Sequence, residues 1–166
     1  MDNQTEHVIG EHDQAVSCVA AGKEPDSLFS AGWDSTLRQW NINAGESRQE
    51  VNKCGLPDRA YTMSFHEGSR CLIVGTAKRF IRIFDSSNIS APSQERVSTL
   101  KHQTRCIRLF SDGAGYAVSS IEGRVGIEFI DPEVSQKSRY AFKCHRSENN
   151  GVTTVYPVNT LAFHPV

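Results

Sequence analysis

The chain has 166 residues, 38% of them hydrophobic and 22% charged, and its 18 Lys and Arg residues nearly balance 19 Asp and Glu residues. It contains no run of about 18 apolar residues and no N-terminal basic segment followed by an apolar one, so we expect neither a membrane span nor a signal peptide. The five cysteines are odd in number and include no C-x-x-C spacing, which favours free thiols in a reducing compartment over disulfides.

A unit of three strands recurs along the chain. In the first copy, residues 15–20 alternate as an inner strand does, residues 27–32 form a second strand, and Trp33-Asp34-Ser35 turns the chain into a third strand at residues 36–40. The second copy places its strands at residues 60–65, 71–75 and 80–84, and the third at residues 105–110, 116–120 and 124–129. This pattern predicts an all-β chain.

Each copy ends on a bulky apolar residue followed by Asn or Asp. The pairs are Trp40-Asn41, Phe84-Asp85 and Ile130-Asp131, which recur at intervals of about 45 residues. Repeats of this length that end in Trp-Asp, or in a relaxed version of it, are typical of WD40 β-propeller blades. The chain resembles that family, with Asn41 in place of the usual Asp in the first pair.

The repeats predict a partial WD40 propeller of about three blades plus the first strand of a fourth. We expect blades at about residues 12–52, 58–100 and 101–145, outer strands at residues 97–100 and 139–143, and the start of a further blade at residues 155–166, with its opening strand at residues 159–163. Closed propellers usually have about 4–8 blades. We therefore expect the chain to be an internal piece of a longer propeller or a shortened product of a longer gene.

Two positions indicate a structural polar network. Asp34 occupies the place where the turn aspartate of a WD40 unit bonds the backbone and a histidine on the preceding loop, and His12 is placed to be that histidine. His102 has a similar spacing from Glu122 in the third unit, 20 residues against 22 for His12 and Asp34. Buried polar groups must find partners, so a structural role is favoured over a catalytic one.

Charge is unevenly distributed. Residues 1–58 carry 4 Lys and Arg against 10 Asp and Glu, whereas residues 96–146 carry 9 against 5. A basic third unit beside an acidic first one favours a localised acidic ligand over general polyanion binding, although ordinary solvated surface accounts for much of such asymmetry.

Four motifs in order carry a closer resemblance: residues 100–108, LKHQTRCIR; 119–125, SSIEGRV; 140–146, YAFKCHR; and 155–159, VYPVN. They resemble the third member of the Bub family, a mitotic spindle-assembly checkpoint WD40 protein. Residues 31–34 and 72–77 match the same family more loosely, so the resemblance covers nearly the whole chain. A sister family, the WD40 protein of messenger-RNA export at the nuclear pore, shares most of these residues.

The resemblance implies a non-enzymatic scaffold that binds a short linear motif of checkpoint kinases and phosphorylated Met-Glu-Leu-Thr repeats of a kinetochore scaffold. It implies a nuclear protein that reaches kinetochores in mitosis. Arg124, which follows the Glu122-Gly123 turn, offers a planar fork to a carboxylate or phosphate. Trp33, in the turn before Asp34, offers an aromatic platform, or else packs against the neighbouring blade.

Lys143 and Arg146 are the residues that we expect to add positive charge for the phosphorylated or acidic ligand. Tyr140 and Phe142 alternate with these polar positions and are expected in the core.

Other classes of function remain open. An enzyme would need an activated nucleophile such as Cys144 beside His145, but neighbours on a strand point to opposite faces. A zinc site at these two residues would need two further ligands at short spacing, which the sequence lacks, so we expect no metal, no cofactor and no enzyme activity.

Nucleic-acid binding by an adaptor of the export type is the stronger rival, given Arg139, Lys143 and Arg146, although we do not expect nucleic acid to be the main partner. A truncated product without independent function is a third alternative.

Overall fold

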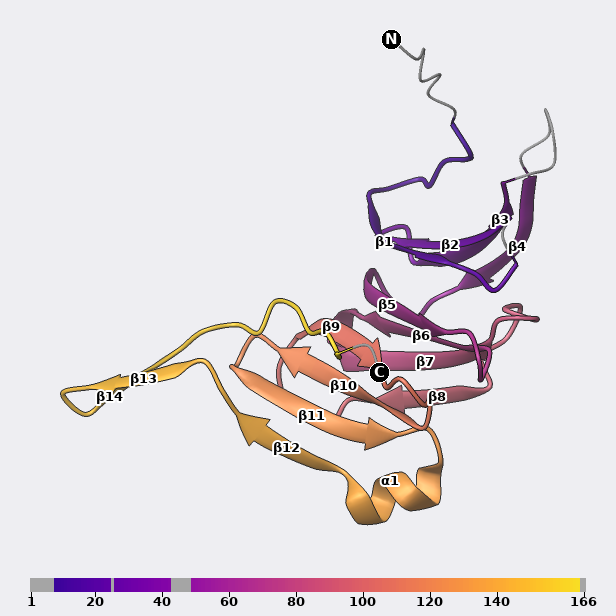
Figure 1. Ribbon diagram of the computed structural model, residues 1–166. Helices are drawn as coiled ribbons and strands as arrows, with labels where there is room; N and C mark the ends of the chain where they lie inside the picture. Colours follow the sequence, from indigo (N-terminus) through magenta and orange to yellow (C-terminus); the bar gives the residue numbers. More distant parts are fainter. Residues whose placement is uncertain (1–7, 25, 43–48, 165–166) are drawn as a thin grey trace, which may run out of the picture.

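The computed structural model describes residues 8–24, 26–42 and 49–164, and these residues form four antiparallel sheets. The first sheet contains β1 (Val16–Ala21), β2 (Ser27–Gly32), β3 (Thr36–Asn41) and β4 (Gln49–Gly55), in that order. The second contains β5 (Ala60–His66), β6 (Cys71–Thr76), β7 (Phe80–Asp85) and β8 (Gln94–Val97), and the third contains β9 (Thr104–Leu109), β10 (Gly115–Ser120), β11 (Arg124–Phe129) and β12 (Tyr140–Lys143). A smaller hairpin of β13 (Arg146–Asn149) and β14 (Val152–Val155) projects from the third sheet (Figure 1).

The three large sheets stack face to face, as blades of a propeller do (Figure 1). One apolar cluster joins the first two sheets and includes Phe29, Leu37 and Phe84, and another joins the second and third and includes Ile107 and Tyr116. Every residue of β6 is buried, because this strand is covered on both faces. Packing between sheets therefore fixes where the turns of neighbouring blades lie relative to one another.

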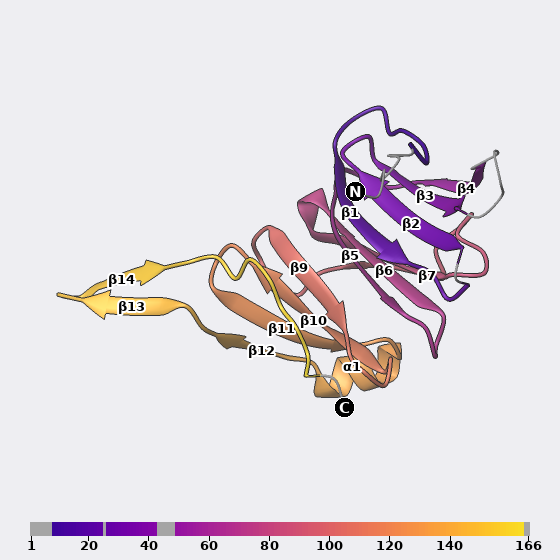
Figure 2. The ribbon, with the colours of Figure 1, turned by 45° about the horizontal axis from the view of Figure 1, so that its top comes forward.

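The inner strands β1, β5 and β9 lie side by side (Figure 2). Side-chain hydroxyls of β5 bind the backbone of β9: Ile107 N donates to Thr62 Oγ1 at 3.0 Å, and Leu109 N donates to Ser64 Oγ at 3.1 Å. The three strands, together with Asn159 and Thr160, line a groove of about 630 Å³. This groove corresponds to the axis around which the blades are arranged.

The outer parts of the sheets differ from the sequence expectations. The outer strand expected at residues 97–100 lies earlier, at β8, and β4 is a strand that the sequence pattern does not indicate. Tyr140 and Phe142, expected in the core, are 59% and 46% exposed, because no described element covers this face of the edge strand β12. The expectation for these two aromatic residues was wrong.

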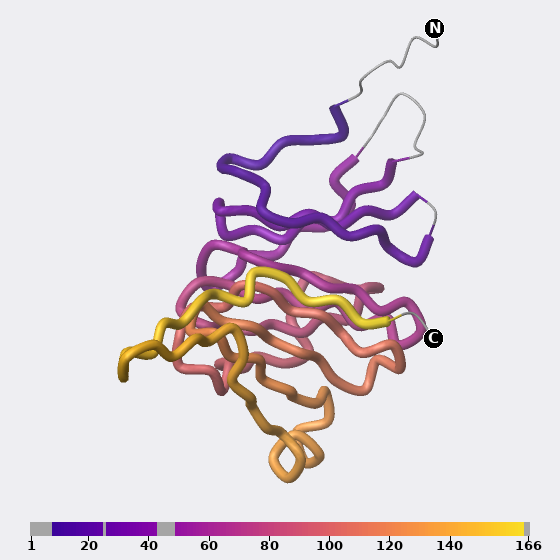
Figure 3. Tube along the Cα trace, turned by 60° about the vertical axis from the view of Figure 1, so that its left-hand side comes forward, coloured from indigo at the N-terminus to yellow at the C-terminus, as the bar shows by residue number. Residues whose placement is uncertain are grey.

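Residues 159–163 form no paired strand, contrary to the expected opening of a further blade. A strand requires a hydrogen-bonded neighbour, and within residues 49–164 this segment has none. The chain returns from the hairpin to the third sheet (Figure 3) just before this segment. There Val158 N donates to the Ser120 carbonyl at 3.2 Å, and the Ser119 hydroxyl donates to the Val158 carbonyl at 2.8 Å. Residues 165 and 166 of the expected blade start, and residues 1–7, 25 and 43–48, lie outside the described part of the chain.

Two short helices interrupt the strands: a 3-10 turn, η1 (Ala77–Arg79), and α1 (Pro132–Ser138). The α1 helix begins with Pro132 at its first turn and with the Asp131 side chain accepting from the backbone N–H groups of Glu133 and Val134. None of the described helices is long and apolar enough to cross a membrane.

Candidate functional site

One face of the stacked sheets carries every residue proposed for binding. Because consecutive strands are antiparallel, the turns β2–β3 and β10–β11 lie at the same end of their sheets as the connections β4–β5, β8–β9 and β12–β13. We call this end the turn face. It holds Trp33 in the β2–β3 turn and Glu122 in the β10–β11 turn.

The β2–β3 turn is held by a buried polar network. Asp34 accepts hydrogen bonds from His12 Nδ1 at 2.9 Å and from the backbone N–H of Thr36 at 3.1 Å. His12 Nε2 lies 2.7 Å from the Ser30 hydroxyl, which also accepts from Trp40 Nε1 at 2.7 Å. This arrangement confirms the expected pairing of Asp34 with His12 and fixes the turn that carries Trp33.

The protonation of Asp34 follows from this network. Burial by itself raises the pKa of Asp34, but the hydrogen bonds from His12, Thr36 and the backbone N–H of Asp13 outweigh burial and hold the pKa well below its ordinary value. Arg38 adds an ion pair at 3.1 Å to the same carboxylate. The group is therefore ionised at neutral pH and acts as a structural acceptor.

Trp33 is 45% exposed, and the guanidinium carbon of Arg59 lies 5.9 Å from its ring centroid. Such a distance is typical of a cation–π contact. Trp33 thus contacts the connection that enters the second sheet while keeping part of its ring open. It lines a groove of about 380 Å³ with Ser17, Arg59, Tyr61, Gln103, Thr104 and Arg105, which we call the aromatic groove.

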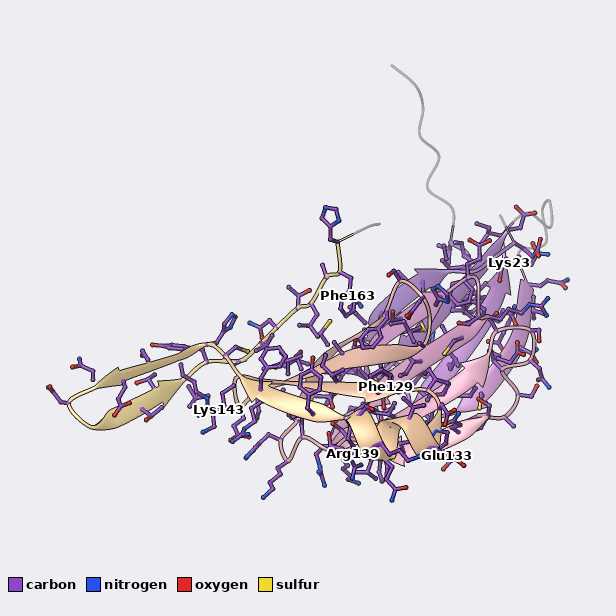
Figure 4. The ribbon with its side chains drawn as sticks, turned by 60° about the horizontal axis from the view of Figure 1, so that its bottom comes forward. Lys23, Phe129, Glu133, Arg139, Lys143 and Phe163 are labelled. Atoms are coloured by element: carbon purple, nitrogen blue, oxygen red, sulfur yellow. The ribbon has the colours of Figure 1, made fainter. Side chains whose placement is uncertain are left out.

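The other three predicted site residues lie together on the third sheet. Arg124 begins β11 and pairs in register with Lys143 at the end of β12, which places both side chains on one side of the sheet. Arg146 begins β13 and donates from Nη2 to the Glu122 carbonyl at 2.8 Å. In Figure 4, Lys143 lies where the chain leaves β12 for the hairpin, and Arg139 lies at the other end of the strand beside α1.

Glu122 is the centre of this group, which we call the arginine cluster. Its Oε1 lies 3.2 Å from Arg124 Nε and 3.7 Å from Arg146 Nη2, and its Oε2 lies 3.5 Å from His102 Nε2. The expected pairing of His102 with Glu122 is present, but His102 is exposed rather than buried as His12 is. The third blade therefore has an accessible charged cluster where the first has a closed network.

Gly123 makes the turn of the arginine cluster possible. Its φ is +60°, and a Cβ at this position would lie 2.6 Å from the Cys144 carbonyl oxygen. The same approach lets Cys144 N donate to the Gly123 carbonyl at 2.8 Å. Glycine thus brings the turn against the β12–β13 connection and places Arg146 beside Glu122.

Sequence reasoning missed Arg59, Tyr61 and Arg105, which complete the aromatic groove. They come from the second and third repeats, whereas Trp33 comes from the first. No spacing within one repeat indicates a groove that three repeats build together, and only the general excess of positive charge in the third repeat pointed toward Arg105.

The chain is similar in sequence to known WD40 proteins. The model of the WD domain, G-beta repeat, matches residues 3–41. The chain is 45% identical over 97% of its length to the mitotic checkpoint protein BUB3.1 of Arabidopsis thaliana, covering 48% of that protein, and 40% identical over 96% of its length to the mitotic checkpoint protein bub3 of Dictyostelium discoideum, again covering 48%.

An RNA-export relative matches as well. The chain is 37% identical over 95% of its length to the Poly(A)+ RNA export protein of Schizosaccharomyces pombe and covers 44% of it. Among solved structures, the WD40 repeats of RRP9 superpose with a TM-score of 0.70 at 13% identity, over 84% of this chain and 42% of that one, which is a likeness of fold alone.

The chain spans about half the length of the curated relatives that it matches. Its sheets have the architecture of WD40 blades in an unclosed arrangement. The chain therefore has the fold of WD40 propeller blades, matches the WD-repeat model at residues 3–41, and over nearly all of its own length resembles the BUB3 mitotic checkpoint proteins.

Proposed function

We propose that the chain is part of a non-enzymatic WD40 scaffold of the spindle-assembly checkpoint, which binds a short motif of checkpoint kinases and phosphorylated repeats of a kinetochore scaffold. Its place of action is then the nucleus, and the kinetochore in mitosis. The proposal rests on the names and identities of the checkpoint relatives and on one structural observation: Trp33, Arg124, Lys143 and Arg146 lie on the same turn face.

The two parts of the turn face suit the two ligands. The aromatic groove offers the half-open Trp33 ring and the guanidinium groups of Arg59 and Arg105 to an extended peptide that has apolar and acidic side chains. The arginine cluster, with Lys143 on the neighbouring strand, offers charge-assisted hydrogen bonds to a carboxylate or a phosphate group.

Calorimetric titration of the kinase-motif peptide tests the proposal. Arg124→Ala should weaken binding by about 2–5 kcal/mol. The substitution removes the positive partner of the charged pair that Arg124 would form with an acidic side chain of the bound peptide, a pair that binding shields from water. Arg139→Ala is the matched control, since it removes the same charge from an exposed position at the other end of β12. Equal affinity of both variants and the parent chain for the peptide would contradict the proposed site.

A messenger-RNA export adaptor is the second candidate, favoured by the Schizosaccharomyces pombe relative. The checkpoint relatives match at up to 45% identity, which is why the checkpoint function comes first. Titration with a single-stranded RNA separates the two, because an RNA-binding adaptor would retain measurable affinity at moderate salt.

A further inference from the structure

Glu122 lies among more positive charge than it neutralises. Arg124 and Arg146 face one of its carboxylate oxygens and His102 faces the other, and Lys143 lies beside Arg124 on the neighbouring strand. Two arginines and one histidine therefore share one carboxylate. Among the described residues, no second carboxylate is paired with Arg124 or Arg146.

Two donors of the cluster are buried without an acceptor. Within the described residues, neither Arg124 Nε nor Arg146 Nε makes a hydrogen bond, although Arg124 Nε lies only 3.2 Å from Glu122 Oε1. The distance makes an ion pair, but the N–H group is not directed at the oxygen. Buried donors without partners are rare in folded proteins and are unfavourable. The cluster thus lacks acceptor oxygens that a second anion would bring.

The charged Glu122 carboxylate is not the only group that holds Arg146. Burial opposes its ionisation, but Arg124, His102 and Arg146 outweigh burial and lower its pKa below the ordinary value. Arg146 is held separately by its hydrogen bond to the Glu122 backbone carbonyl at 2.8 Å, which does not depend on the carboxylate. Removing the carboxylate therefore leaves Arg146 anchored to the backbone of residue 122.

We propose that Glu122 is a built-in counter-ion that competes with an anionic ligand group for Arg124 and Arg146, and so sets the affinity and charge preference of the cluster. With two arginines against one carboxylate and Lys143 on the neighbouring strand, the cluster favours a phosphate dianion over a singly charged carboxylate. The inference rests on the proposed function only for the source of that anion, a peptide side chain, and its test uses simple anions.

The experiment titrates inorganic phosphate, and separately acetate, into the 166-residue chain and into Glu122→Gln at low ionic strength. The readout is the NMR signals of the arginine Nε–H groups, assigned through Arg124→Lys and Arg146→Lys. We expect phosphate to bind in preference to acetate in the parent chain, and to bind about tenfold more tightly in Glu122→Gln because one unit of negative charge is removed. Glu133→Gln, which removes the same charge from the exposed surface of α1, should leave phosphate affinity unchanged.

A thermal melt of each variant separates binding from folding, and Glu122→Asp, which keeps the charge at a shorter reach, provides a second variant if Glu122→Gln is unstable. Weaker or unchanged phosphate binding in Glu122→Gln would overturn the inference, as would the absence of saturable phosphate binding in both proteins. Failure of the kinase-motif peptide to bind, with these phosphate results intact, would instead count against the proposed function alone.

Discussion

Trp33 and Asp34 are adjacent in sequence and have different tasks. The Asp34 carboxylate accepts hydrogen bonds inside the first blade, whereas the Trp33 ring is 45% exposed and contacts Arg59 from the next connection. Neighbouring positions of one turn therefore separate folding from binding. Substitutions at the two positions should affect different measurements.

Trp33→Ala should weaken binding of the kinase-motif peptide by about 2 kcal/mol, since aromatic anchors contribute strongly to interfaces. Its melting temperature should change little, because much of the ring faces solvent. Phe142→Ala, at similar exposure on β12 outside the aromatic groove, is the control and should bind normally. A large fall in melting temperature with unchanged affinity would assign Trp33 to packing between blades.

Asp34→Asn should lower the free energy of unfolding by about 1–3 kcal/mol, because it weakens a buried acceptor of several hydrogen bonds. Chemical denaturation measures this change, with Asp13→Asn as the control, since Asp13 pairs with the same arginine at 3.6 Å but its side chain is 83% exposed. Equal destabilisation by the two substitutions would contradict the network.

The lowered pKa of Asp34 also predicts a pH dependence. A carboxylate whose pKa is lower in the folded state stabilises the fold fully above its unfolded pKa of about 3.9 and loses that contribution as pH falls through the folded value. The stability difference between the parent chain and Asp34→Asn should therefore be constant near neutrality and shrink below about pH 4. A difference that grows on acidification would have the wrong sign.

At the scale of elements, the sequence predicts the strands with regular apolar spacing. The inner and middle strands, such as β2 and β6, bury apolar residues between blades, so their pattern is strong. The outer strands β4 and β8, with sequences QEVNKCG and QERV, are polar because they meet solvent, and their position depends on the strand that they pair with. The aromatic groove was beyond prediction for a similar reason, because Arg59 and Arg105 reach Trp33 only after the blades have packed.

The β13–β14 hairpin has a local signal that the repeat analysis passed over. Asn150 and Gly151 form its turn with φ values of 51° and 76°, the positive values that an Asn-Gly hairpin turn requires. A Cβ on Gly151 would meet no atom within 4 Å, so Gly151→Ala tests backbone strain alone.

Gly151→Ala should destabilise the hairpin locally by about 1–2 kcal/mol, the cost of a left-handed conformation for a residue with a Cβ. Hydrogen exchange should show faster exchange of the β13 and β14 amides and unchanged protection in β6 and β10. Faster exchange throughout the sheets would mean that the hairpin is part of the cooperative core.

At the scale of the whole molecule, the 166-residue polypeptide exposes apolar surface that its described residues do not cover. Tyr140 and Phe142 lie side by side on the edge strand β12, with ring centroids 6.5 Å apart, and Val16 and Val19 are exposed on β1. Uncovered sheet faces and free strand edges favour association. We therefore expect the isolated polypeptide to self-associate.

Sedimentation of the 166-residue polypeptide should give a mass that rises with concentration, and Tyr140→Ser with Phe142→Ser should reduce that rise. Val134→Ser, at an exposed position of α1, should leave it unchanged. A monodisperse monomer with a sharp, cooperative melting transition would contradict this expectation.

The most direct test of the checkpoint assignment is the location of the protein in dividing cells. The endogenous protein that contains this chain, tagged with a fluorophore, should concentrate at unattached kinetochores in mitosis and leave them once microtubules attach. Arg124→Ala in the same protein should reduce that concentration if the turn face recruits checkpoint partners. Persistent labelling of the nuclear rim, with no kinetochore signal in mitosis, would contradict the account and favour the export alternative.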